Sequence, residues 1–215
     1  MIQNMQKDKT KKTKIIVKAP TQERSRQTVA TILEACSRLL VSEGFFSITT
    51  DKIAKEAGVS IGSLYQFFGN KESVVQAVVK QLMEEDKRIA NEKMKSISPL
   101  PADQKARALI ELAFEICRRN FELRSKLTTI QYYVTDANYV SDFIRFFQDV
   151  LKENLPAIPG KDMNLVCNLI VNAFIGLVNT MAIDNPNYIN DQALLGEITQ
   201  LFFKYLGIET TASAS

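Results

Sequence analysis

Apolar residues recur along most of the chain at the three- and four-residue spacing of an amphipathic helix. The first run covers about residues 21–43 and ends before Gly44. Its apolar face consists of Val29, Ile32, Leu33, Cys36, Leu39 and Leu40. No segment shows the strict alternation of apolar and polar residues that marks a half-buried strand. The pattern therefore predicts an all-α protein.

Two short helices are expected next, over about residues 49–57 and 60–68, and then a long helix over about 71–96. A loop containing Pro99 and Pro101 follows the long helix, because proline interrupts helical hydrogen bonding. Beyond this loop, helical spacing between asparagine- and proline-containing breaks predicts helices over residues 103–119, 122–136, 139–154, 162–183 and 190–206.

Charge is distributed unequally along the chain. Through Lys80 there are 13 lysines and arginines against 7 acidic residues, and the remainder has 14 against 17. A basic front part indicates an anionic partner, of which nucleic acid is the usual one, although a solvated basic tail without a partner is the alternative. Residues 1–20 hold six lysines, a single aspartate and few apolar side chains, which predicts a disordered basic arm.

The composition excludes the commonest catalytic and metal-binding chemistry. The chain contains no histidine, and Cys36, Cys117 and Cys167 show no CxxC spacing. Each cysteine has apolar neighbours, as expected of a reduced, buried thiol. Paired acids at a cleft-like spacing and glycine-rich phosphate loops are also absent from the sequence. We therefore expect no enzyme activity, no metal and no cofactor.

No targeting or membrane segment is expected. The N-terminal residues are basic and lack the apolar core of a signal peptide. The most apolar stretch, Leu165–Val178, is interrupted by Asn168 and Asn172, and it is shorter than the ~20 apolar residues of a membrane span. These features predict a cytoplasmic protein.

The segment TTDKIAKEAGVSIGSLYQFFGNK, residues 49–71, has the features of a helix-turn-helix. Ala54 is small where two steeply crossing helices must touch, and Gly58 permits a left-handed turn between them. Val59 and Leu64 are apolar residues that can fix the second helix on the first. In this motif the second helix lies in the major groove of DNA, with its N-terminal residues nearest the bases.

Over about Arg24–Val79 the sequence resembles the tetracycline-repressor (TetR) family of bacterial transcriptional regulators. The resemblance rests on EGFFSITT after the first helix, on the three-helix unit, and on the aromatic run followed by NKE. It implies a DNA-binding domain over residues 21–82, with its motif at about 49–68. A helical regulatory and dimerisation domain would follow over residues 83–208.

The resemblance also implies which residues contact DNA. One threonine of the Thr49–Thr50 pair would cap its helix and the other would contact a phosphate, while Gly62 would let the backbone approach the bases closely. Gln66 is the best candidate for reading a base edge, because a carboxamide can form two hydrogen bonds with adenine. Phe68 is expected in the core, whereas Phe67 could pack on a thymine methyl or in the core. The implied DNA-binding residues are Arg24, Arg26, Thr49, Thr50, Ser60, Ile61, Gly62, Ser63, Tyr65, Gln66 and Lys71.

The last two long helices carry more apolar residues than a small domain needs to bury. In TetR-like proteins the corresponding helices form a four-helix bundle across a twofold axis, which implies a homodimer. The residues expected in the dimer interface are Leu165, Leu169, Ala173, Leu177, Leu195, Ile198, Leu201, Phe202 and Tyr205. An asparagine stripe that includes Asn168 and Asn172 lies either at this seam, in a pocket or on an exposed polar face.

The region between these helices and the DNA-binding domain is rich in aromatic residues. Such a helical domain could enclose an apolar pocket with a few polar groups, although the same residues could simply fill the core. The candidate ligand-binding residues are Phe114, Cys117, Phe121, Gln131, Tyr132, Tyr133, Phe143, Phe147 and Asn172.

The sequence therefore predicts a DNA-binding transcriptional regulator with double-stranded operator DNA as its partner. The favoured form is a repressor that a small, largely apolar effector releases from a palindromic operator. The alternative is a regulator, either activator or repressor, that has no small-molecule ligand.

Overall fold

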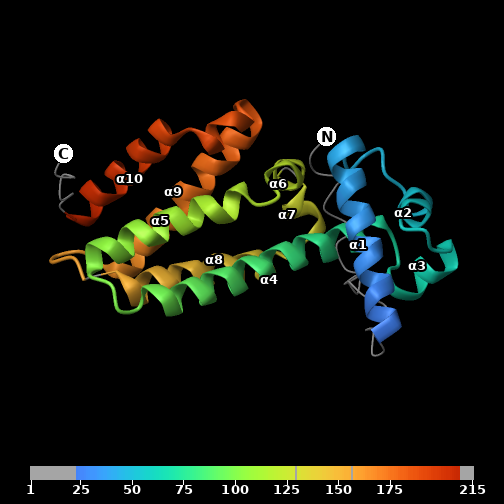
Figure 1. The fold of residues 1–215 in the computed structure, drawn as a ribbon, viewed down its shortest axis with the longest axis horizontal. Coiled ribbons are helices and arrows are strands. Elements are labelled where there is room, and N and C mark those ends of the chain that lie inside the picture. The colour runs from blue at the N-terminus through green and yellow to red at the C-terminus, as the bar shows by residue number, and fades with distance from the viewer. Residues whose placement is uncertain (1–22, 129, 156, 209–215) are drawn as a thin grey trace, which may run out of the picture. The chain divides into compact units, whose positions relative to one another are not determined.

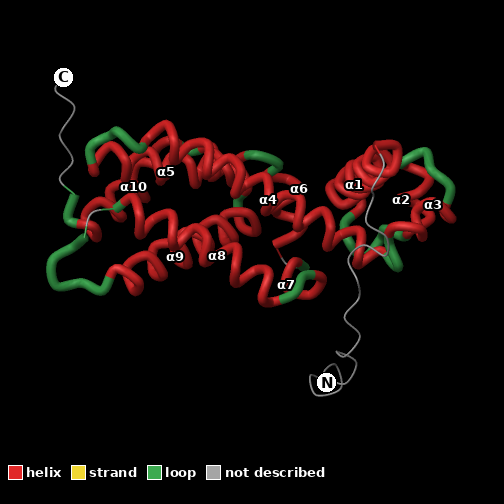
Figure 2. Tube along the Cα trace, turned by 90° about the horizontal axis from the view of Figure 1, so that it is seen from below, coloured by secondary structure: helices red, strands yellow, loops and turns green. Residues whose placement is uncertain are grey.

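The computed structural model describes residues 23–128, 130–155 and 157–208, and these residues form helices and no strand (Figures 1 and 2). The all-α fold class predicted from the hydrophobic pattern is confirmed. The basic arm predicted over residues 1–20 lies outside the described residues.

The helices follow one another along the chain with short connections. In chain order they are α1 (Glu23–Glu43), α2 (Thr50–Glu56), α3 (Ile61–Phe67), α4 (Lys71–Ile97), α5 (Ala102–Arg118), α6 (Phe121–Thr128), α7 (Gln131–Val134), α8 (Ala137–Asn154), α9 (Met163–Asp184), the 3-10 helix η2 (Pro186–Asn190) and α10 (Gln192–Leu206).

One predicted helix is divided in the structure, and another is preceded by a short 3-10 helix that was not expected. The single helix expected over residues 122–136 is replaced by α6, which ends at Thr128, and α7, which begins at Gln131. Thr128 and Ile130 are β-branched, and such residues favour helix less than straight-chain residues do. The helix expected over residues 190–206 is observed as α10, and the 3-10 helix η2 precedes it. Asp191 separates them, because its carboxylate accepts hydrogen bonds from the amides of Ala193 and Leu194 and so caps α10.

The chain forms two compact units. The first contains the described residues up to Gln81 together with Tyr133–Thr135, and the second contains Leu82–Tyr132 and the described residues from Asp136 onward. The boundary thus falls inside α4. The short segment Tyr133–Thr135, which includes the end of α7, belongs to the first unit although it is remote from it in sequence.

The core of the first unit forms where α1 packs against α2 and α2 against α3. Its innermost side chains are fully buried and come from every one of these helices and from the connecting turns. They include Ile32, Leu40, Ile48, Ile53, Leu64 and Phe68. Gly44 and Gly58 have positive φ angles of 76° and 67°, as the helix ends at these positions require.

In the second unit, one core contains side chains from α5, α8, α9, η2 and α10. Figure 1 shows how α5, α8, α9 and α10 are arranged in this unit. Phe114 of α5 lies at its centre, with its ring 5.1 Å from that of Phe174 on α9 in an edge-to-face arrangement. α9 packs against both α8 and η2. This unit therefore has its own hydrophobic core, separate from that of the first.

Candidate nucleic-acid interface

The start of α2 is fixed by Thr49. Its Oγ1 accepts a hydrogen bond from the backbone amide of Lys52 at 3.2 Å, so Thr49 is the N-cap of the helix. Thr50 instead pairs with Tyr65 of α3, with 3.0 Å between the two hydroxyl oxygens. Of the two threonines, Thr49 therefore fills the capping role, and the hydroxyl of Thr50 lies on the surface that α2 and α3 share.

The turn between α2 and α3 has the construction that the sequence predicts. Ala54 is buried between the helices, and its carbonyl accepts a hydrogen bond from the amide of Val59 at 3.0 Å. Gly58, with φ +67°, occupies the left-handed conformation that most other residues avoid. Leu64 is fully buried and holds α3 against α2.

The recognition helix α3 presents polar groups at its N-terminal end. Ser60 is its N-cap, accepting a hydrogen bond from the amide of Ser63 at 3.0 Å, and the two hydroxyl oxygens lie 2.8 Å apart. Ile61 and Gln66 are exposed, and Tyr65 retains 47% of its surface. The opposite face of the helix, which includes Leu64 and Phe67, is buried, so α3 is oriented with this polar surface outward.

Gly62 lies on the same exposed turn of α3. A Cβ placed on Gly62 would meet only the Ser60 hydroxyl at 3.8 Å, which is an ordinary contact. The free protein therefore does not require glycine at this position. A close approach to DNA would be the reason for it.

The three aromatic residues at the end of α3 differ in how far they are buried. Phe67 and Phe68 are both buried, so both side chains belong to the core of the first unit. The choice left open for Phe67 is thereby resolved in favour of the core. Tyr65 is the one aromatic residue of the three whose side chain is available to a partner.

Lys71, at the start of α4, stabilises the segment that leads into α2. Its ammonium group donates hydrogen bonds to the carbonyl oxygens of Phe45 at 3.0 Å and Ile48 at 3.3 Å. It also lies 4.5 Å from the centroid of the Phe45 ring, a cation–π distance. Two of the three ammonium hydrogens are thus engaged within the protein, and the third can bind a phosphate oxygen.

We expect Lys71→Met to lower both thermal stability and DNA affinity. The stability loss follows from two charge-assisted hydrogen bonds, each worth about 1.5–3 kcal/mol. If the ammonium also neutralises a phosphate, the slope of log affinity against log salt concentration falls by ~0.9. Unfolding midpoints and salt titrations of operator binding measure the two effects separately. A lower midpoint with an unchanged slope would show that Lys71 serves only the turn.

The first turn of α1 supplies two arginines. Arg24 and Arg26 are exposed, and Arg26 has only a loose ion pair with Glu23 at 3.9 Å. Exposed pairs of this kind contribute little to stability, so both guanidinium groups can be redirected to phosphates at low cost.

The described residues contain no group of three or more histidine, cysteine or acidic side chains placed to hold a metal ion. Burial raises the pKa of the Cys36 thiol to about 12, so this cysteine stays protonated and unreactive near neutral pH. The cysteine is fully buried on α1 in the core of the first unit.

The predicted dimer-interface residues fall into two groups in the second unit. Ile198 and Phe202 are buried within the unit itself, so they have no surface to offer a partner. The other seven are exposed or half-buried, and they are Leu165, Leu169, Ala173, Leu177, Leu195, Leu201 and Tyr205. Asn172 is also exposed on α9, where its amide donates to the carbonyl of Asn168.

The predicted ligand-binding residues do not form one cluster. Phe114, Cys117 and Phe121 belong to the main core of the second unit, while Phe147 packs around Ala90 with its neighbours on α8. The ring of Phe143 lies 5.1 Å from that of Phe147. The side chains of Gln131 and Tyr132 lie outside the described residues. The exposed Tyr133 contacts Phe45 of the first unit, at 6.3 Å between ring centroids.

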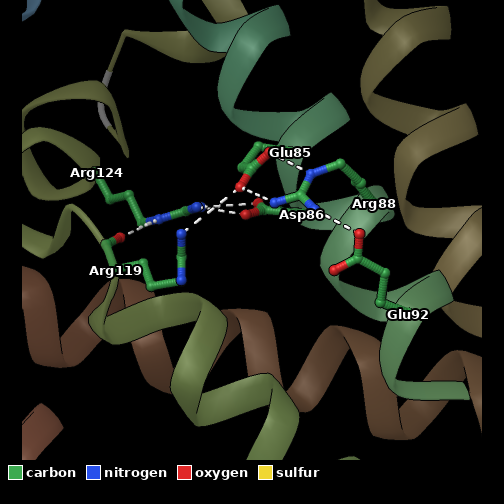
Figure 3. Close-up of polar contacts among 6 residues, drawn as sticks. All are labelled: Glu85, Asp86, Arg88, Glu92, Arg119 and Arg124. Atoms are coloured by element: carbon green, nitrogen blue, oxygen red, sulfur yellow. Dashed lines mark hydrogen bonds and ion pairs between the residues drawn. The ribbon is translucent and has the colours of Figure 1, made fainter. Parts of the chain in front are cut away.

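The second unit contains a buried ion pair that the sequence pattern did not predict. Asp86 of α4 has 1% of its side chain exposed and binds the guanidinium of Arg124 through both oxygens, at 2.6 and 3.0 Å (Figure 3). Burial raises the pKa of the Asp86 carboxyl above its ordinary value. A signal for this pair exists in the sequence, because Asp86 occupies the helical spacing shared by the buried residues Met83 and Ala90.

Comparison with known protein families agrees with this geometry. Residues 32–78, which span most of α1, all of α2 and α3 and the start of α4, match the family model described as bacterial regulatory proteins, tetR family. A Bacillus subtilis protein named "Fatty acid metabolism regulator protein" is 26% identical over 175 residues, covering 73% of this chain and 84% of that protein. The regulator TtgR of Pseudomonas putida is 35% identical over 82 residues, covering 37% of this chain and 39% of that protein.

Solved structures show the same fold. The fatty acid degradation regulator FadR from Bacillus halodurans matches with a TM-score of 0.64 and 20% identity, over 84% of this chain and 95% of that one. A TetR-family transcriptional regulator from Streptomyces coelicolor matches with a TM-score of 0.61 and 22% identity, over 84% of this chain and 98% of that one.

Proposed function

We propose that this chain, whose residues 32–78 match the model of the tetR family of bacterial regulatory proteins, is a homodimeric repressor that a small, largely apolar effector releases from a palindromic operator. The observation that carries this proposal is the outward polar face of α3. Ser60, Ser63, Tyr65 and Gln66 are held there by a buried opposite face, as groove reading requires. The relatives are regulators and not enzymes, and the chain is proposed to act in the same way.

Each residue of this surface is proposed to have one of two roles. The hydroxyls of Thr50, Ser63 and Tyr65, with the cations of α1 and Lys71, bind phosphates and set the position on the duplex. Gln66 is exposed on α3 and reads a base edge, because its carboxamide can bond adenine bidentately. Gly62 allows the backbone of α3 to approach the bases.

Selection of bound sites from random DNA by the purified protein tests the proposal. We expect an inverted repeat, because two subunits related by a twofold axis present two equivalent recognition helices. Recovery of no preferred sequence, or of single sites without symmetry, would contradict the proposed dimeric operator complex.

Gln66→Ala is expected to relax the selected preference at one base pair in each half-site, at a cost of about 1–3 kcal/mol per base contact. Gln81→Ala is the matched control, since this exposed amide lies on α4 of the same unit and outside the proposed surface. The same selection, repeated with both variants, provides the measurement. An unchanged preference in Gln66→Ala would mean that α3 docks with another residue facing the bases.

The proposed effector belongs to fatty acid metabolism, since two of the relatives are named as regulators of that metabolism. An apolar ligand suits the second unit, whose core joins aromatic side chains from α5 and α9. By linkage, an effector that releases DNA must itself bind more weakly when DNA is bound.

The chain passes between the two units at three points, which are inside α4, before Tyr133 and after Thr135. We propose that these connections carry the effector signal. Tyr133 packs on Phe45, and the carbonyl of Phe45 accepts a hydrogen bond from Lys71 in the segment leading into α2. A displacement of Tyr133 therefore reaches the start of the helix-turn-helix directly.

A further inference from the structure

Arg118 lies in the last turn of α5, in the second unit. Its Nε donates a hydrogen bond to the carbonyl oxygen of Ile189 at 2.9 Å, and Ile189 is a buried residue of η2. The contact joins two segments 71 residues apart in the sequence. A cation in this position also interacts favourably with the C-terminal end of the α5 dipole. These contacts account for only part of the guanidinium group.

The Nη2 atom of Arg118 is buried and has no hydrogen-bond acceptor among the described residues. None of the ion pairs found in that part of the chain includes Arg118, whereas Arg124 nearby is matched by Asp86. A buried donor on a charged group without an acceptor is costly, and few such groups occur in folded proteins. An acceptor from outside the chain would remove this cost.

An aromatic ring lies beside the Arg118 guanidinium. Its central carbon lies 5.9 Å from the centroid of the Phe114 ring, which in turn packs on Phe174. The adjacent Cys117 offers no counter-charge, because burial raises the pKa of its thiol to about 12. A single cationic donor beside an aromatic pair is the arrangement that orients an apolar ligand through one polar end.

We propose that Nη2 of Arg118 binds an oxygen of an acyl group, and that the apolar chain of this acyl compound lies against Phe174, the half-buried member of the Phe114–Phe174 pair. The inference rests on the proposed effector and names its polar end. A carboxylate fits best, because it only accepts hydrogen bonds and its charge balances the guanidinium. The carbonyl oxygen of a neutral ester or thioester can also accept this hydrogen bond, but it carries no charge to balance the guanidinium and should bind more weakly.

Ligand-induced changes in the thermal midpoint of the full chain, without DNA, test this inference. The probes share one alkyl chain and differ at the end, and they are dodecanoic acid, methyl dodecanoate and dodecylamine, each below its micelle concentration. We expect the acid to raise the wild-type midpoint, the ester to raise it less, and the amine to leave it unchanged. In Arg118→Gln, affinity for the acid should fall about tenfold or more, because a charge-assisted hydrogen bond is lost.

Arg107→Gln is the matched control, since Arg107 also lies on α5 and near an aromatic ring, that of Phe203, but is exposed. It should respond to the acid as the wild type does. Arg118→Lys retains the charge and should keep part of the response even if Arg118→Gln is too unstable to measure. An ester response equal to that of the acid would identify the carbonyl as the bound group and support the shared acceptor.

Equal responses of the wild type and the Arg118 variants would overturn the inference. The same holds if none of the three probes shifts the wild-type midpoint, or if a crystal structure with the acid shows only water at Nη2. In each of these cases operator binding, measured separately, would still decide the proposed function.

Discussion

Leu169→Glu is expected to convert the protein into monomers and to abolish operator binding at concentrations where the wild type is saturated. Leu169 of α9 retains 49% of its surface in the isolated subunit, and Leu165 on the same helix retains 58%. Ala173, one turn further along α9, is exposed as well. A row of exposed apolar side chains on one helix is typical of an interaction surface, and the proposed dimer would cover it.

The expected size of the effect follows from the twofold axis. Each dimer carries two copies of residue 169, so the substitution would bury two carboxylates without partners, at about 3–5 kcal/mol each. The dimer dissociation constant should therefore rise by at least about a thousandfold. Operator affinity should fall with it, because a monomer can occupy only one half-site.

Sedimentation equilibrium measures the first effect and operator titration the second. The wild type should have about twice the 24.2 kDa mass of the chain, and Leu169→Glu should have the chain mass. Tyr188→Glu is the control, because this exposed aromatic residue lies on η2, outside α9 and α10. A Leu169→Glu variant that stays dimeric would place the interface elsewhere.

The parts of the fold that the sequence predicts are those governed by local rules. The helix-turn-helix could be found because its cap at Ser60, its turn at Gly58 and its buried Leu64 lie within a few residues of one another. Each of these residues has a physical reason for its position that needs no knowledge of the rest of the chain. Helical periodicity also predicts that Tyr65 lies on the surface and Phe68 in the core.

The features that could not be predicted depend on contacts between distant segments. Tyr133 lies in the aromatic-rich region and was grouped with Phe114, but it packs in the first unit beside Phe45. Nothing in its local sequence distinguishes a core aromatic from an exposed one. The contacts of Lys71 could not be predicted for the same reason. Its hydrogen bonds to the carbonyls of residues 45 and 48 depend on how α4 packs and not on its neighbours in sequence.

The buried pair of Asp86 and Arg124 is the second feature with a large expected effect. The two residues are separated by 38 positions and join α4 to α6 (Figure 3). Arg124 also donates through Nε to the carbonyl of Arg119, so its guanidinium is held from two sides. Burial disfavours the charged carboxylate, and the bidentate contact with Arg124 offsets part of this effect.

Asp86→Leu is expected to lower the free energy of unfolding by about 3–5 kcal/mol, because it leaves a largely buried guanidinium without its carboxylate partner. The double variant Asp86→Leu/Arg124→Leu should recover most of this loss, since two apolar side chains replace both charges. Chemical denaturation of the wild type, both single variants and the double variant completes the cycle. Arg88→Leu is the control, because its pairs with Glu85 and Glu92 are exposed and should leave the midpoint unchanged. If the double variant is as unstable as Asp86→Leu, the loss arises from packing at α4 and not from the unpaired charge.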